Sequence, residues 1–149
     1  MWYPAEKVFY GIHGGSGYLF RFDPRAGKVE VLQRIVSEES RKSGMHDQFN
    51  YGYLEFTLSP DGHTLYYLTG APRAAAGEGD EDIHLITFHI PSRKYMDHGA
   101  VVLEDEQRPA YAQAIAVGRT GEVYTVSKIK HGGRLTAEII SFPGPQGRR

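Results

Sequence analysis

Residues 54–68 read LEFTLSPDGHTLYYL, and this stretch decides the fold. Two runs of strand-forming residues flank a Ser-Pro-Asp-Gly turn. The turn has a physical basis, because proline presets φ and glycine tolerates a positive φ. A matching stretch, AIAVGRTGEVYTV, occupies residues 114–126, and its turn also ends in glycine. Both stretches predict β-hairpins.

Two shorter phrases repeat around these hairpins. An apolar run that closes on Phe and then Pro occurs three times, as LFRFDP (19–24), LITFHIP (85–91) and IISFP (139–143). A His-Gly-Gly turn precedes two of them, at residues 13–15 and 131–133. No apolar pattern with a sustained period of 3.6 residues is present, and the polar stretch 37–42 is expected to form a surface turn or a loop. The sequence therefore predicts an all-β protein.

The repeats predict a β-propeller portion made of four-stranded antiparallel blades, whose strands we call A to D from the axis outward. The Phe22-to-Phe88 and Phe88-to-Phe142 intervals exceed the roughly 40–50 residues of a propeller repeat, which indicates insertions at 34–52 and 71–82. Residues 1–149 would form one fragment of partial, full and partial blades. The expected strands are B–D of blade 1 (7–12, 18–23, 28–33), A–D of blade 2 (53–59, 64–69, 83–90, 98–103) and A–C of blade 3 (112–117, 122–128, 135–142).

Two phrases carry a family resemblance. LSPDGHTLY (58–66) and FRFDPRAGKV (20–29) resemble the SPDG…LY and FDP-x-TGKV phrases of YVTN-, NHL- and SMP-30-like propellers. The resemblance implies the propeller fold but no single function, because this architecture hosts lyases, lactonases, dehydrogenases and binding scaffolds. It also implies a site near the axis, on the face of the D–A and B–C loops. Those loops are residues 13–17, 34–52, 71–82, 104–111 and 130–134.

The expected blades leave unpaired edges at both ends of the array. A first blade without strand A and a third without strand D do not sum to one blade, and open edges favour pairing with another chain. We therefore expect self-association, or further blades of a larger propeller, as partners.

The loop 34–52 brings His46, Asp47, Gln48 and Tyr51 close together ahead of an innermost strand. Polar groups beside flat aromatic rings suit a small hydroxyl-rich ligand such as a carbohydrate. Alternatively, the aromatic residues of this loop wedge between blades, and His46 and Asp47 cap the turn.

The corresponding loop one blade on carries Arg108 and Tyr111. Arg108 would clamp a carboxylate or stabilise developing negative charge, or else pair with Glu104 or Glu106 at the surface. His13 and His131 recur in equivalent turns, where they serve either as ligand or acid/base groups or as structural residues beside a Gly-Gly bend. The catalytic candidates are His46, Arg108 and His131.

Composition narrows the class of partner. The chain has 17 basic and 18 acidic residues, a net charge of −1 and no cysteine, so it predicts neither nucleic-acid nor membrane binding and leaves the compartment open. It shows no signal peptide. His84 and His89 lie five apart on one strand and point to opposite faces, and the acidic stretch 77–82 lacks calcium-loop spacing, so no metal or cofactor is predicted.

Two functions remain open at this point. The first is a ligand-binding or scaffold portion of a propeller with an aromatic and polar mouth. The alternative is a lyase or hydrolase that acts on a carbohydrate, a lactone or a similar ring compound.

Overall fold

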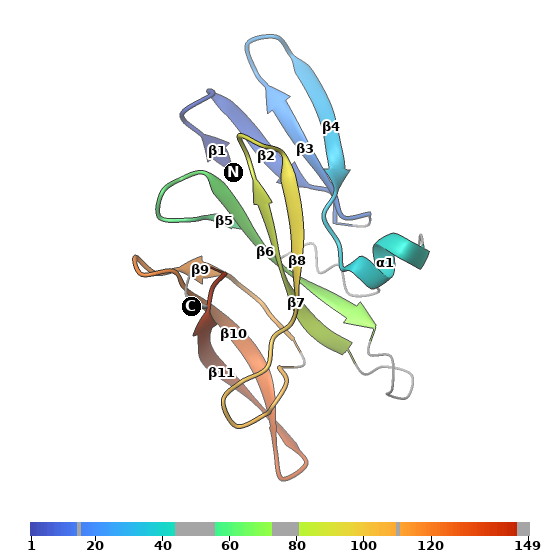
Figure 1. Ribbon diagram of the computed structural model, residues 1–149, viewed down its shortest axis with the longest axis vertical. Helices are drawn as coiled ribbons and strands as arrows, with labels where there is room; N and C mark the ends of the chain where they lie inside the picture. Colours follow the sequence, from blue (N-terminus) through green and yellow to red (C-terminus); the bar gives the residue numbers. More distant parts are fainter. Residues whose placement is uncertain (15, 44–55, 73–80, 110, 146–149) are drawn as a thin grey trace.

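The computed structural model describes residues 1–14, 16–43, 56–72, 81–109 and 111–145 (Figure 1). Within them the chain forms three antiparallel sheets and one short helix. In every sheet the strands pair in the order in which they occur along the chain. The predicted all-β class is confirmed.

The first sheet has four strands: β1 (Trp2–Tyr3), β2 (Val8–Ile12), β3 (Tyr18–Asp23) and β4 (Lys28–Arg34). The structure corrects the expectation that this sheet lacks its first strand, because Trp2 and Tyr3 pair with Phe9 and Val8. Pro4 ends the strand after two residues, so the strand is too short to show an alternation of apolar and polar residues in the sequence.

The second sheet contains β5 (Thr57–Leu58), β6 (Thr64–Pro72), β7 (Glu81–His89) and β8 (Lys94–Ala100). The Ser-Pro-Asp-Gly hairpin forms as predicted, with Gly62 at φ 73° and Leu58 paired with Leu65. The last strand begins at Lys94, four residues earlier than the expected span of 98–103.

The third sheet has three strands among the described residues: β9 (Ala116–Val117), β10 (Glu122–His131) and β11 (Arg134–Pro143). The β9–β10 turn uses Gly121 at φ 96°, in agreement with the predicted second hairpin.

Helix α1 (Glu38–Ser43) lies between β4 and β5, where a turn or a loop was expected. It packs against the second sheet, since the Tyr95 hydroxyl donates a hydrogen bond to the Val36 carbonyl just before the helix. Among the described residues no helix is long and apolar enough to cross a membrane.

Figure 1 shows the three sheets one after another, with the first strands β1, β5 and β9 along one side of the molecule. The first and second sheets touch through Arg93, whose guanidinium lies 2.8 Å from Glu30. The second and third touch where the Tyr66 ring lies beside Gly144. Among the described residues, the second sheet therefore has a neighbour on each face, and each outer sheet has one neighbour.

The strand registers align the three sheets residue by residue. One row of side chains crosses each sheet and includes a phenylalanine on the third strand, and we call it the phenylalanine row. It comprises Trp2–Phe9–Phe22–Val29, then Leu58–Leu65–Phe88–Tyr95, then Val117–Val123–Phe142. We call the face that carries it the front face of the sheet.

The adjacent row lies on the opposite face, the back face, and places a tyrosine on the second strand of each sheet. This tyrosine row contains Tyr10, Tyr66 and Tyr124, paired with Arg21, Thr87 and Ser141 on the third strand. On the front face of the second sheet, Tyr95 hydrogen-bonds to Val36, which follows the last strand of the first sheet in sequence. On its back face, Tyr66 lies beside Gly144, which follows the last strand of the third sheet in sequence. Front faces therefore meet the preceding sheet, and back faces meet the following one.

Candidate functional site

Four of the predicted ligand-binding residues lie outside the described part of the chain: His46, Asp47, Gln48 and Tyr51. The proposed aromatic and polar mouth thus remains a prediction for this loop. The other four candidates, His13, Arg108, Tyr111 and His131, are described.

Arg108 pairs with a residue that the sequence did not suggest. Its Nη1 atom lies 2.6 Å from Oδ2 of Asp82, at the start of β7, instead of pairing with Glu104 or Glu106. Asp82 is nearly buried, while the Arg108 side chain is 42% exposed. A buried carboxylate needs a partner more than an exposed one does, and the contact ties the loop after the second sheet to that sheet.

The remaining three candidates each interact with a near neighbour in the chain or the fold. His13 Nδ1 lies 2.7 Å from the Ser16 hydroxyl, and His131 Nε2 lies 2.7 Å from Glu138. The Tyr111 ring lies 5.0 Å from the Lys128 ammonium. His13 belongs to the first sheet and His131 to the third, and Figure 1 shows these sheets at opposite ends of the molecule. The described geometry therefore does not bring His13 and His131 together in one site.

A buried ionic cluster lies between α1 and the second sheet, and sequence reasoning did not find it. His84 Nδ1 donates to both carboxylate oxygens of Asp97 at 3.0 Å. Asp97 also accepts the backbone N–H groups of Glu38 and Gly99, each at 2.8 Å. One carboxylate thereby joins strands β7 and β8 to the first turn of the helix.

The pKa shifts follow from these contacts. Burial alone lowers the pKa of His84, but the hydrogen bond and the charge of Asp97 outweigh it and raise that pKa above its ordinary value. Burial alone raises the pKa of Asp97, yet His84 and the two backbone donors hold that pKa below its ordinary value. Both shifts favour the ion pair.

Glu39 completes a possible set of metal ligands, since one donor atom each from Glu39, His84 and Asp97 lies within 4.8 Å of the others. Asp97 already accepts hydrogen bonds from three donors. These hydrogen bonds hold α1 against the second sheet. Metal binding by Asp97 would require some of them to break.

The front face of the first sheet is an open apolar surface. Trp2, Phe9 and Val29 of its phenylalanine row are 43%, 42% and 57% exposed. The equivalents of Phe9 in the other two sheets, Leu65 and Val123, are buried. The Trp2 and Phe9 ring centroids lie 4.9 Å apart, and those of Phe9 and Phe22 lie 6.4 Å apart.

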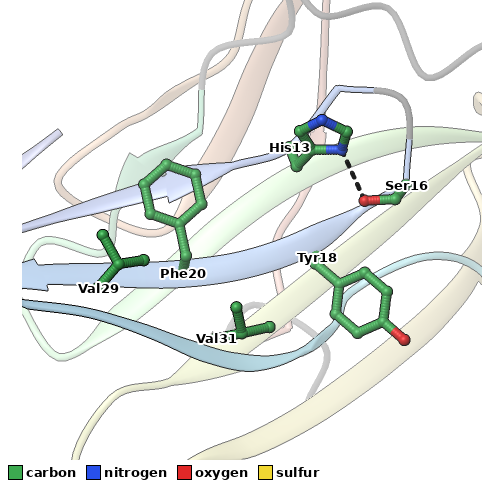
Figure 2. A pocket seen from close by; sticks show the side chains of 6 residues that line it. All are labelled: His13, Ser16, Tyr18, Phe20, Val29 and Val31. Atoms are coloured by element: carbon green, nitrogen blue, oxygen red, sulfur yellow. Dashed lines mark hydrogen bonds between the residues drawn. The ribbon is translucent and has the colours of Figure 1, made fainter.

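This face is hollowed into a groove beside the aromatic row. Figure 2 shows Phe20, Val29 and Val31 along the groove, with Tyr18 and the His13–Ser16 hydrogen bond at one end. Phe20 lies over Gly11 of the neighbouring strand, which has no side chain to occupy that space. The groove can therefore receive apolar side chains from a facing sheet.

The back face of the third sheet, at the other end of the array, also exposes apolar side chains. Tyr124 is 42% exposed, although its equivalents Tyr10 and Tyr66 are buried. Leu135 and Ile139 lie on the same face and are also exposed. Each end of the array thus exposes a second-strand side chain, Phe9 or Tyr124, whose equivalents in the other two sheets are buried.

No family model matches the sequence, and no curated protein matches it. The two exposed apolar end faces are the best-supported candidate site in the described part of the chain. The repeated Phe22, Phe88 and Phe142 were visible in the sequence, but the register that places them in one row was not.

Proposed function

We propose that the chain is a binding and scaffold module of the β-propeller type, which works by packing its two open end faces against further β-sheets. The three sheets would be successive blades of a ring. Support comes from the consecutive strand order in each sheet and from the sequence phrases that resemble YVTN-, NHL- and SMP-30-like propellers.

One observation carries the proposal: side chains on the second strand of each sheet are buried where a neighbouring sheet is present and exposed where it is missing. Phe9 is 42% exposed, whereas its equivalents Leu65 and Val123 are buried. Tyr124 is 42% exposed, whereas its equivalents Tyr10 and Tyr66 are buried. Phe88 and Phe142 are buried on the front faces of the second and third sheets, while Phe22 lies on the open face of the first sheet. Contiguous exposed apolar surface of this kind marks interaction sites in folded proteins.

The carbohydrate-like ligand predicted at the mouth is a second element of this proposal, and it depends on residues 34–52. The lyase or hydrolase alternative needs His46, Arg108 and His131 to act together. Arg108 and His131 are each engaged by a carboxylate in separate parts of the fold. The described geometry therefore favours the binding module.

The test compares two face variants with a matched control. Phe9→Glu places a charge on the open front face, and Tyr124→Glu places one on the open back face. Val102→Glu makes the same kind of change at an apolar residue that is 47% exposed and belongs to neither row. All three substitutions leave the buried core in place, which circular dichroism would verify.

Two readouts cover both states of the faces: solution mass by light scattering and the binding of an apolar fluorescent dye. If the wild-type faces are open, the face variants bind less dye. If the faces are covered by association, the face variants lose mass. We expect Val102→Glu to match the wild type in both readouts. Face variants that match the wild type in mass and in dye binding would overturn the proposal.

A further inference from the structure

The chain carries both halves of the junction that joins its own sheets. In the first internal junction the back face of the first sheet, with buried Tyr10, meets the front face of the second, with buried Phe88. The second junction repeats this with Tyr66 and Phe142. What remains exposed is a back face with Tyr124 and a front face with Phe9, which together would form one further junction of the same kind.

We propose that a second copy of this chain covers the open faces head to tail, so that Tyr124 of each copy packs against the front face of the other. This inference rests on the proposed function and names the partner that the end faces bind. The contact is heterologous, and two such contacts related by a twofold axis close the ring.

The number of sheets favours two copies. Closed propellers usually contain about 4–8 blades. Three sheets are described in each chain, so two copies give six, whereas three copies exceed that range. A pair of chains also leaves no end face uncovered, which an open-ended stack would do.

The internal junctions predict which side chains meet. Tyr66 lies beside Gly144, where a Cβ atom would stand 3.5 Å from the Tyr66 ring. Gly144 follows Phe142 by two residues, as Pro24 follows Phe22. Tyr124 of one copy should therefore lie beside Pro24 of the other copy, with Phe9 and Phe22 beneath the facing sheet.

The groove in Figure 2 fits this arrangement. Its apolar walls, formed by Phe20, Val29 and Val31, carry no charged group. The opposite end face offers Leu135 and Ile139, which are 54% and 79% exposed and sit on the same side of the sheet as Tyr124. Burial of these apolar side chains would supply the main driving force for pairing.

The experiment measures the mass of the full chain by sedimentation velocity over a range of micromolar concentrations. We expect the wild type and Val102→Glu to form a discrete species of about 33 kDa, twice the 16.7 kDa of one chain. Phe9→Glu alone and Tyr124→Glu alone should each dissociate, with association weakened at least about tenfold because both junctions are then damaged.

Mixing the two variants identifies the geometry. A pair formed from one copy of each has one junction in which both faces are native and one in which both are altered. An equimolar mixture should therefore recover the 33 kDa species more strongly than either variant alone. Front-to-front pairing would instead leave Tyr124→Glu fully paired and would overturn the inference.

Other outcomes separate this inference from the proposed function. A wild-type monomer whose dye binding falls in both face variants would overturn the second copy and leave the open binding faces intact. A ladder of larger species that is sensitive to both variants would likewise overturn ring closure alone. Face variants with unchanged mass and dye binding would overturn both proposals.

Discussion

Asp97 is the residue that ties helix α1, in the segment between the first two sheets, to the second sheet. Its side chain is 4% exposed and accepts from His84 and from the backbone of Glu38 and Gly99. A buried charge is stable only when it is paired and hydrogen-bonded, and here the donors come from β7, β8 and α1. The cluster therefore makes the position of the helix dependent on protonation.

The pH dependence of stability follows from the two shifted pKa values. His84 has a folded pKa above 6.5, because Asp97, Glu39 and Asp82 all favour its charged form. Its contribution is complete below the unfolded value and is lost as pH rises through the folded value. The folded pKa of Asp97 lies below 3.8, so its contribution is present above that value and is lost as pH falls through the folded one.

We expect His84→Gln to lower the free energy of unfolding by about 2 kcal/mol near pH 6, with a smaller loss at higher pH. Urea unfolding between about pH 5 and pH 9 measures this difference. His63→Gln is the control, since His63 is exposed. A loss for His84→Gln that does not shrink as pH rises would contradict the assignment of the charged pair.

At the scale of elements, the pairing of β2 with β3 depends on a glycine beneath an aromatic ring. A Cβ atom on Gly11 would lie 2.2 Å from Cζ of Phe20, which is far inside van der Waals contact. We expect Gly11→Ala to displace this ring and to destabilise the protein by about 1–2 kcal/mol. The cost should disappear in a Phe20→Ala background and persist in a Val29→Ala background, in a double-mutant cycle measured by urea unfolding. Additive effects of Gly11→Ala and Phe20→Ala would show that the ring does not depend on the glycine.

Elements with local signals were predictable from the sequence, and those set by tertiary contacts were not. The span of β3 agrees with the expected 18–23, because its alternation and its Asp-Pro end are local features. The last strand of the second sheet was expected at 98–103 because residues 101–103 are apolar. The observed strand β8 begins earlier and includes Asp97, whose place in the strand depends on its buried pair with His84. Helix α1 is wholly polar in sequence, and the contacts that order it come from residues more than 50 positions away.

The candidate site shows the same division. The repeated phenylalanines were found in the sequence, but their alignment with Tyr10, Tyr66 and Tyr124 required the strand registers. The Arg108 contact with Asp82 spans 26 residues and crosses from a loop to a strand, so spacing alone pointed to the nearer Glu104 and Glu106. Local patterns thus predicted the strands, and the packing between sheets decided which side chains meet.

For the whole molecule, covalent linkage of two copies provides a test of ring closure that does not depend on substitutions. In a closed pair the third sheet of one copy lies beside the first sheet of the other, so a flexible linker of about the length of the 101–115 connection between β8 and β9 should join them. Linkage makes both junctions of the pair intramolecular and raises the effective concentration of each face for its partner. We therefore expect the fused chain to remain a single 33 kDa species and to melt at a temperature that is independent of protein concentration.

The unlinked chain should melt at a temperature that rises with concentration, because folding is then coupled to pairing. A fused chain that assembles further would mean that the end faces repeat without closing, and calorimetry with light scattering distinguishes the two outcomes.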